Sequence, residues 1–195
     1  MTGADRYGIL DPEDPVERTR YERHFYHAYV RLTDNTLTRS IWDWDDGNQL
    51  LRARIPYHDQ VIYSWSDRAG RPIGYLAVNV HAHRAFQADA FGFAPEPNTR
   101  SGGPDHCCEI LTLMRTGHPR RATVLDYRDF VGGFAYPDLV DRGFTVAYAT
   151  CTRRRLRPYL LLGAQLVHRA TLRGEERFLL RWPIFELAAG PTAGG

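Results

Sequence analysis

A tyrosine followed four residues later by a glycine is the spacing in this chain that most directly suggests chemistry. The segment is Arg155–Ile184, RLRPYLLLGAQLVHRATLRGEERFLLRWPI, in which Tyr159 precedes Gly163. The pattern predicts a short helix that ends at the glycine and is followed by two apolar strands. In a helix, the phenol would lie one turn before the C-terminal end and point back along the axis. A phenol held in that position can donate a proton.

The run Phe144–Thr152, just before this helix, is rich in β-branched and aromatic residues and predicts a central strand. The strand and the Tyr-x-x-x-Gly helix together resemble the C-terminal half of the GNAT N-acyltransferase superfamily. In that family the helix follows the fifth strand, and its tyrosine protonates the leaving thiolate of an acyl thioester. The resemblance therefore implies that Tyr159 is the catalytic acid.

The other predicted elements extend this resemblance to about residues 16–184. Their order, from hydrophobic periodicity and turn signals, is helix 16–32, helix 36–55, strands 60–66, 72–80 and 106–114, a helix toward residue 134, strand 144–152, the Tyr159 helix and two final strands. Pro137 is expected to break the helix that precedes residue 144. Apart from a first strand that the sequence does not reveal, this is the GNAT order. We expect an α+β fold with a mixed central sheet, splayed middle strands and flanking helices.

The length of 195 residues is enough for one domain with a sizeable core and short for two. We expect a single domain over residues 16–185. Residues 1–15 are polar and proline-bearing, and residues 186–195 are small, so both are predicted to be a flexible arm and tail.

The strand His106–Met114 carries two expectations from the resemblance. The first is that the backbone of this strand holds the acyl-thioester arm, through Leu111, Thr112, Leu113 and Met114. The second is that Glu109 is the general base for the incoming amine, since an ammonium must lose a proton before it can attack. Two alternatives stay open, a carboxylate paired with an arginine and a water acting as the base.

The family's pyrophosphate loop, Arg/Gln-x-x-Gly-x-Gly/Ala, is where this chain departs from the pattern. Its glycines allow backbone amides to approach phosphate closely. Aligning Leu125 with the apolar residue after the loop puts Arg120 and Ala122 at the glycine positions. Positive charge nevertheless gathers here and could hold one phosphate of a pantetheine arm, through Arg115, His118, Arg120 and Arg121.

Relatives with degraded loops, such as the autoinducer synthases and N-acyl amino acid synthases, take the acyl group from an acyl carrier protein. A carrier protein is acidic and carries one phosphodiester. It could dock on an arginine cluster made of Arg153, Arg154, Arg155 and Arg157, although a solvated helix start is the simpler interpretation. The expected co-substrate is an acyl-phosphopantetheine thioester, on a carrier protein or on coenzyme A (CoA), with no tightly bound cofactor.

The acceptor pocket in this fold usually lies among the first two helices and the irregular segment before residue 106. Its candidate residues here are Tyr26, Trp42, Asp43, Trp44 and His83. The sequence IWDWDDG joins flat apolar surfaces to three carboxylates and would suit an amine-bearing or heteroaromatic acceptor. It would equally suit a tryptophan pair in the core with aspartates capping turns.

The amino-acid composition bears on the partners, the chemistry and the localisation of the protein. The formal net charge is only +2, which gives no bulk attraction to nucleic acid or membrane. The chain has no lysine, so lysine Schiff-base chemistry is excluded, and its all-arginine usage indicates a GC-rich bacterial genome. Three cysteines, no signal peptide and no apolar run of about 20 residues predict a cytoplasmic protein.

The sequence also offers residues for two other chemistries, a zinc site and a cysteine nucleophile. A zinc site from His81, His83, His106 and the adjacent cysteines lacks the usual ligand spacing, so no metal is expected. A nucleophilic Cys108 or Cys151 is conceivable, although buried structural thiols are commoner on strands.

The sequence thus predicts an N-acyltransferase that moves an acyl group from a phosphopantetheine thioester to an amine of a small molecule, in bacterial natural-product biosynthesis. The rival prediction is a catalytically silent GNAT-like module that binds an acyl thioester or a protein partner. Predicted partners are the amine, an acyl carrier protein and a second copy of the chain.

Overall fold

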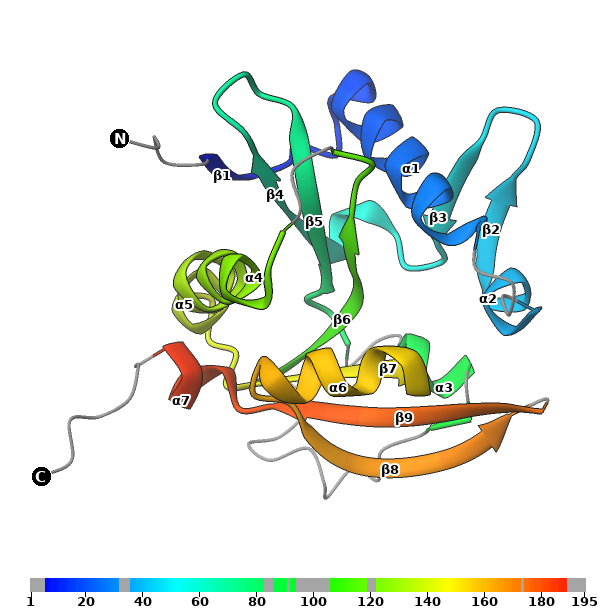
Figure 1. Ribbon diagram of the computed structural model, residues 1–195, viewed down its shortest axis with the longest axis vertical. Helices are drawn as coiled ribbons and strands as arrows, with labels where there is room; N and C mark the ends of the chain where they lie inside the picture. The colour runs from blue at the N-terminus through cyan, green and yellow to red at the C-terminus, as the bar shows by residue number, and fades with distance from the viewer. Residues whose placement is uncertain are drawn as a thin grey trace, which may run out of the picture. The chain divides into compact units, whose positions relative to one another are not determined.

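The computed structural model describes residues 6–31, 36–82, 86–90, 92–93, 106–118, 122–172 and 174–188 (Figure 1). The chain divides into two compact units, which are described separately below. The first comprises residues 1–79 and 110–121, and the second comprises residues 80–109 and 122–195. Within the described ranges, no helix combines the length and the apolar character that crossing a bilayer requires.

The main sheet has seven strands in the order β1-β4-β5-β6-β7-β9-β8, and β2 and β3 form a separate pair. The strands are β1 (Arg6–Ile9), β2 (Trp42–Asp45), β3 (Leu50–Ala53), β4 (Gln60–Ser66), β5 (Pro72–Asn79), β6 (Cys107–Arg115), β7 (Val146–Thr152), β8 (Gln165–Leu172) and β9 (Glu175–Trp182). Pairing is parallel between β6 and β7 and antiparallel for β1–β4, β4–β5, β7–β9 and β8–β9. The predicted fold class, α+β with a mixed central sheet flanked by helices, is confirmed.

In the first unit, α1 (Pro15–Tyr29) forms where the apolar period predicted a helix. Its first turn is capped by Asp14, whose carboxylate accepts hydrogen bonds from the amides of Val16 and Glu17. The period of the helix buries Tyr21 and Phe25. The predicted hairpin is confirmed as β4 and β5, whose inward residues, including Trp65 and Tyr75, are fully buried.

Two predictions for the first unit were wrong. The arm predicted over residues 1–15 contains β1, the missing first strand, which pairs with β4 along its whole length. The helix predicted over residues 36–55 is a short helix, α2 (Thr36–Ile41), followed by the β2–β3 hairpin. Trp42 and Trp44 alternate with aspartates, which is the strand period, and the turn Asp45–Gln49 carries the only positive φ found for a described residue other than glycine, 57° at Gln49.

The second unit carries its helices around β7, β8 and β9. They are α3 (Gln87–Ala90), α4 (Val124–Phe130), the π-helical turn η4 (Val131–Ala135), α5 (Tyr136–Asp141), α6 (Arg153–Leu161), a helix along β7 and β9 (Figure 1), and α7 (Ile184–Ala188). A capping box of Thr123 and Asp126 begins α4. The break expected at Pro137 takes the form of the π turn, which precedes the proline. Helix α7 extends to residue 188, so part of the predicted tail is helical.

Gly163 ends α6 in a left-handed conformation, with φ of 89°. A Cβ atom added there would lie 2.9 Å from a methyl carbon of Leu187 on α7. Because that methyl group is at the end of a half-buried side chain that can rotate, the main constraint is the backbone conformation.

We expect Gly163→Ala to lower the free energy of unfolding by about 1–2 kcal/mol, the cost of a left-handed residue with a Cβ. The melting temperature should fall by roughly 2–4 °C for each kcal/mol. Gly133→Ala is the matched control, because its Cβ would meet no atom within 4 Å and its φ is not positive. Equal melting temperatures for Gly163→Ala and the unmodified protein would contradict the assignment of a strained C-cap.

Candidate active site

Tyr159 lies on the last turn of α6, the helix that starts directly after β7. Its carbonyl accepts the amide of Ala164 at 3.0 Å, so the helix closes around Gly163 as predicted. The half-buried ring packs edge-on against Trp182 of β9, with 5.6 Å between ring centroids. The spacing read from the sequence therefore places the phenol against the sheet.

Trp182 is the functional candidate that sequence reasoning missed. Its indole Nε1 is buried and has no hydrogen-bond partner among the described residues. Buried donors without a partner are uncommon in folded proteins. The residue looks like an ordinary strand aromatic in the sequence, and only its contact with Tyr159 draws attention to it.

Glu109 is almost completely buried, and both oxygens of its carboxylate are engaged. Oε2 accepts the amide of Gln87 at 2.6 Å, and Oε1 accepts the amide of Ala88 at 2.7 Å. These are the first amides of α3, which would otherwise lack partners. The observed geometry gives Glu109 a structural role, that of tying β6 to α3, and its role as a general base stays a prediction.

The strand β6 runs through the predicted arm-binding residues. It pairs with β7 at Cys107, Cys108 and Glu109, opposite Val146–Tyr148, and this ladder covers three residue pairs in the described part of the chain. Leu111, Thr112 and Met114 are buried, and Leu113 is partly exposed. The Thr112 hydroxyl lies 3.0 Å from the hydroxyl of Tyr29 on α1.

The segment after β6 is bound to the β4–β5 hairpin. The Nε2 atom of His118 lies 3.1 Å from the carboxylate of Asp67, and the Thr116 hydroxyl donates to the carbonyl of Pro72. The amide of Arg71, its side chain and His118 together hold the pKa of Asp67 well below its ordinary value. Because His118 faces this carboxylate, it is oriented for local structure rather than for phosphate.

The other basic residues that were predicted to contact phosphate are Arg115, Arg120 and Arg121. Arg115 is exposed and donates to the carbonyl of His118 at 3.1 Å. Arg120 and Arg121 lie outside the described residues, as does His83, which was predicted for the acceptor pocket.

The aromatic residues predicted for the acceptor pocket do come together in the first unit. Trp42 is buried between Phe25 and Tyr29, with ring centroids 4.9 and 4.8 Å away. Trp44 packs edge-on against Tyr26, and the guanidinium of Arg39 lies 4.5 Å from its ring centroid.

The three carboxylates of this region already have partners. Asp43 pairs with Arg54 at 3.0 Å, and Asp45 caps the hairpin turn by accepting two hydrogen bonds from Asn48. Asp46 accepts hydrogen bonds from Tyr26 and Arg39. This arrangement matches the alternative in which the tryptophans belong to the core and the aspartates hold turns.

The three cysteines were candidate nucleophiles or metal ligands in the sequence. All three cysteines are free and buried, and burial raises the pKa of Cys108 and raises that of Cys151 to about 12, which disfavours a thiolate nucleophile. Nowhere in the described ranges do three or more His, Cys, Asp or Glu side chains gather in a way that could hold a metal ion.

In the arginine cluster predicted to dock a carrier protein, Arg153 pairs with Glu176 at 3.2 Å, and all four arginines are exposed.

Comparison with known proteins was made by sequence and by structure. No protein-family model matches the chain, and no curated protein matches it in sequence. The solved structures that resemble it include three informative ones. One is BjaI, a CoA-dependent acyl-homoserine lactone synthase solved with SAM and isopentyl-CoA (TM-score 0.66, 12% identity, covering 95% of this chain and 87% of that chain).

The second is FeeM, an N-acyl amino acid synthase from uncultured soil microbes (TM-score 0.60, 9% identity, 94% of this chain and 93% of that chain). The third is a protein of the GNAT family from Desulfovibrio desulfuricans (TM-score 0.57, 12% identity, 93% of this chain and 99% of that chain). At these identities the likeness shows the fold. The chain has the fold of the GNAT acyltransferases, as the Tyr-x-x-x-Gly helix suggested.

The structural role of Glu109 predicts a stability effect. Glu109→Gln would present one oxygen and one NH₂ group to two amides, so one buried donor would face another donor. We expect a loss of about 2 kcal/mol in the free energy of unfolding, measured by urea denaturation. Glu17→Gln, on the exposed face of α1, is the control and should change stability by less than about 0.5 kcal/mol. Full stability of Glu109→Gln with loss of acyl transfer would instead favour the general-base role.

Proposed function

We propose that this protein is an N-acyltransferase that moves an acyl group from a phosphopantetheine thioester to an amine of a small molecule. The observation that carries the proposal is the placement of Tyr159 in a GNAT fold, on the helix that follows β7, with its ring packed edge-on against that of Trp182. The structural neighbours named above include an acyl-homoserine lactone synthase and an N-acyl amino acid synthase. These neighbours support the proposal through the shared fold.

The mechanism we propose assigns a few residues of this chain to separate tasks. The arm of the donor would lie along the backbone of Leu111–Met114, the part of β6 that continues beyond the ladder with β7. The amine nitrogen, after losing a proton, attacks the thioester carbonyl, and the carbon–sulfur bond breaks as the carbon–nitrogen bond forms. Tyr159 gives its proton to the departing thiolate. Since the carboxylate of Glu109 holds two amides, we assign deprotonation of the amine to a water.

The arginine cluster supports a carrier protein as the donor. Arg153, Arg154, Arg155 and Arg157 lie at the N-terminus of α6, where the helix dipole is already positive. Cations are least favourable at that end of a helix and anions most favourable. An acidic protein surface would offset this charge, and it would also suit a donor site whose phosphate loop lacks the usual glycines. CoA esters are the alternative donors.

The donor is identified by a thermal-shift screen with acetyl-CoA, longer acyl-CoAs and an acylated carrier protein. A true donor at 100 times its dissociation constant should stabilise the fold by about 2.7 kcal/mol and raise the melting temperature. If the carrier protein is the donor, Arg154→Glu combined with Arg157→Glu should abolish its shift, whereas Arg142→Glu, at an exposed site directly after α5, should not. No shift with any donor would favour the silent binding module.

The catalytic assignment is tested by Tyr159→Phe in an assay of thiol release. We expect kcat to fall by about 100-fold or more, because a positioned acid contributes about 10²–10⁴ in rate. The dissociation constant of the donor should stay within about twofold. Tyr7→Phe, on strand β1, removes a hydroxyl from the first unit and should leave both quantities unchanged. An unchanged kcat for Tyr159→Phe would remove this residue from the mechanism.

A further inference from the structure

Arg128 and Tyr136 lie eight residues apart on the continuous segment α4–η4–α5. In a regular α-helix of 3.6 residues per turn, this spacing would separate them by about 80° around the axis. In η4 the amide of Tyr136 donates to the carbonyl of Val131, five residues back, so the π turn adds one residue. The eight residues then make about two full turns, and the two side chains point to the same side.

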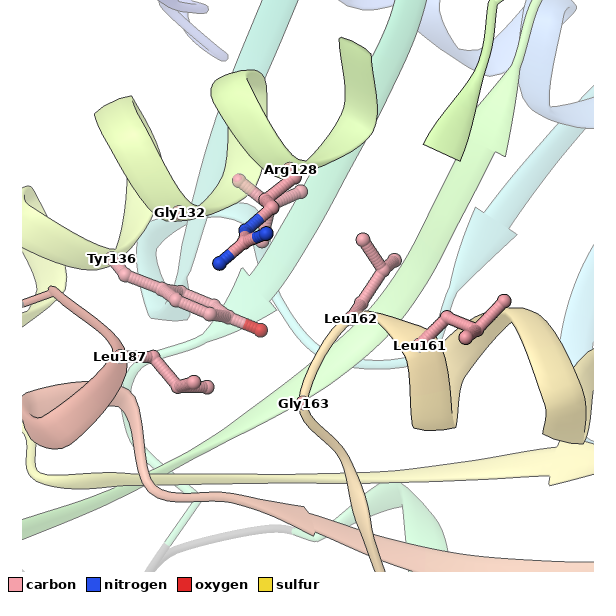
Figure 2. A pocket seen from close by; sticks show the side chains of 8 residues that line it. Arg128, Gly132, Tyr136, Leu161, Leu162, Gly163 and Leu187 are labelled. Carbon is pink, nitrogen blue, oxygen red and sulfur yellow. The ribbon is translucent and has the colours of Figure 1, made fainter. Parts of the chain in front are cut away.

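That side is a cavity of about 200 Å³ within the second unit (Figure 2). Its opposite wall is aliphatic and is formed by Leu161, Leu162 and Gly163 at the end of α6 and by Leu187 of α7. Figure 2 shows the guanidinium of Arg128 and the hydroxyl of Tyr136 directed into this space. The cavity therefore joins a positively charged, hydrogen-bonding wall to an apolar one.

Neither polar group has a hydrogen-bond or ion-pair partner among the residues that the structure describes. Tyr136 is only 2% exposed, and its hydroxyl makes no hydrogen bond to any described residue. The guanidinium of Arg128 likewise has no ion pair or hydrogen bond within the described ranges. Burial raises the pKa of Tyr136 well above its ordinary value, so the phenol stays protonated and is available as a donor. Arg128 is an exposed residue, so its guanidinium and the phenol that lines the cavity are both available to a ligand that enters from solvent.

We propose that this cavity binds the carboxylate end of a short aliphatic chain. A guanidinium and a phenol supply donors for two oxygens and balance one negative charge, which matches a carboxylate. A phosphate would bring further oxygens against the leucines, where no donor meets them. The volume corresponds to about seven water molecules, which is enough for a chain of roughly five carbons.

Such a carboxylate can come from two sources. It can be a free carboxylic acid, or it can be the far end of an acyl group that carries a second carboxylate. Leu162 and Gly163 follow Tyr159 on the same helix by about one turn, so an acyl group whose thioester lies at Tyr159 could extend into the cavity. The second source rests on the proposed function, and the first does not.

The test is calorimetric binding to the full chain with two matched pairs of probes. Valerate against valeramide reports a free carboxylate, and glutaryl-CoA against valeryl-CoA reports a carboxylate at the end of an acyl group. We expect at least tenfold tighter binding of the charged member in one pair, and we expect Arg128→Gln to remove that preference. Tyr136→Phe should weaken the binding of the charged member of that pair severalfold. Arg142→Gln, which removes an arginine paired with Asp138 on α5, is the control and should keep the preference.

A preference for valerate identifies a free ligand, and a preference for glutaryl-CoA identifies the acyl group. The inference is overturned if neither pair shows a preference, or if the preference survives in both Arg128→Gln and Tyr136→Phe with melting temperatures unchanged. These results are separate from the turnover of Tyr159→Phe. Loss of turnover in Tyr159→Phe without any carboxylate preference would keep the proposed function and reject this site. Binding of valerate without acyl transfer would keep this site and reject the proposed function.

Discussion

The parallel ladder between β6 and β7 is the constraint from which the candidate site follows. It joins Cys107–Glu109 to Val146–Tyr148 and then ends, although both strands continue. On its other side β7 is paired with β9 from Ala147 to Thr152, which fixes the exit of β7 and thus the start of α6. Because β7 is paired along its length with β9, the start of α6 and the place of Tyr159 on it do not depend on the short ladder with β6.

One polar contact and one backbone conformation fix the ends of this arrangement. At the end of the ladder, the buried carboxylate of Glu109 binds the first amides of α3, so the strand and the helix cannot move apart without breaking two buried hydrogen bonds. At the end of α6, Gly163 adopts a conformation that other residues resist, and it stops the helix one turn after Tyr159. The position of Tyr159 is therefore set by the end of its helix and by the packing of its ring against Trp182.

The parts that could be predicted from the sequence were those with a local cause. The α1 period, the β4–β5 hairpin and the Tyr159 helix with its glycine stop follow from side-chain spacing and turn chemistry, and the structure confirms them. The β2–β3 hairpin was missed because its apolar residues are few and Thr36–Ile41 is indeed helical. The contacts of Glu109 with α3 and of Trp182 with Tyr159 join residues more than twenty positions apart, and no local pattern could reveal them. For the same reason, the sequence alone could not show whether the aspartates near Trp42 and Trp44 bind an acceptor or hold turns.

The two tyrosines of the second unit are suited to different tasks by their surroundings. Tyr136 is fully buried, and its raised pKa makes its proton harder to give to a thiolate, whose own basicity is lower than that of a phenolate. Such a group is better used as a fixed hydrogen-bond donor, which binds an anion without losing its proton. Tyr159 is half-buried on the following helix, and its ring packs edge-on against that of Trp182. A phenol that is partly open to solvent can reach a ligand, so Tyr159 is the better candidate of the two for proton transfer.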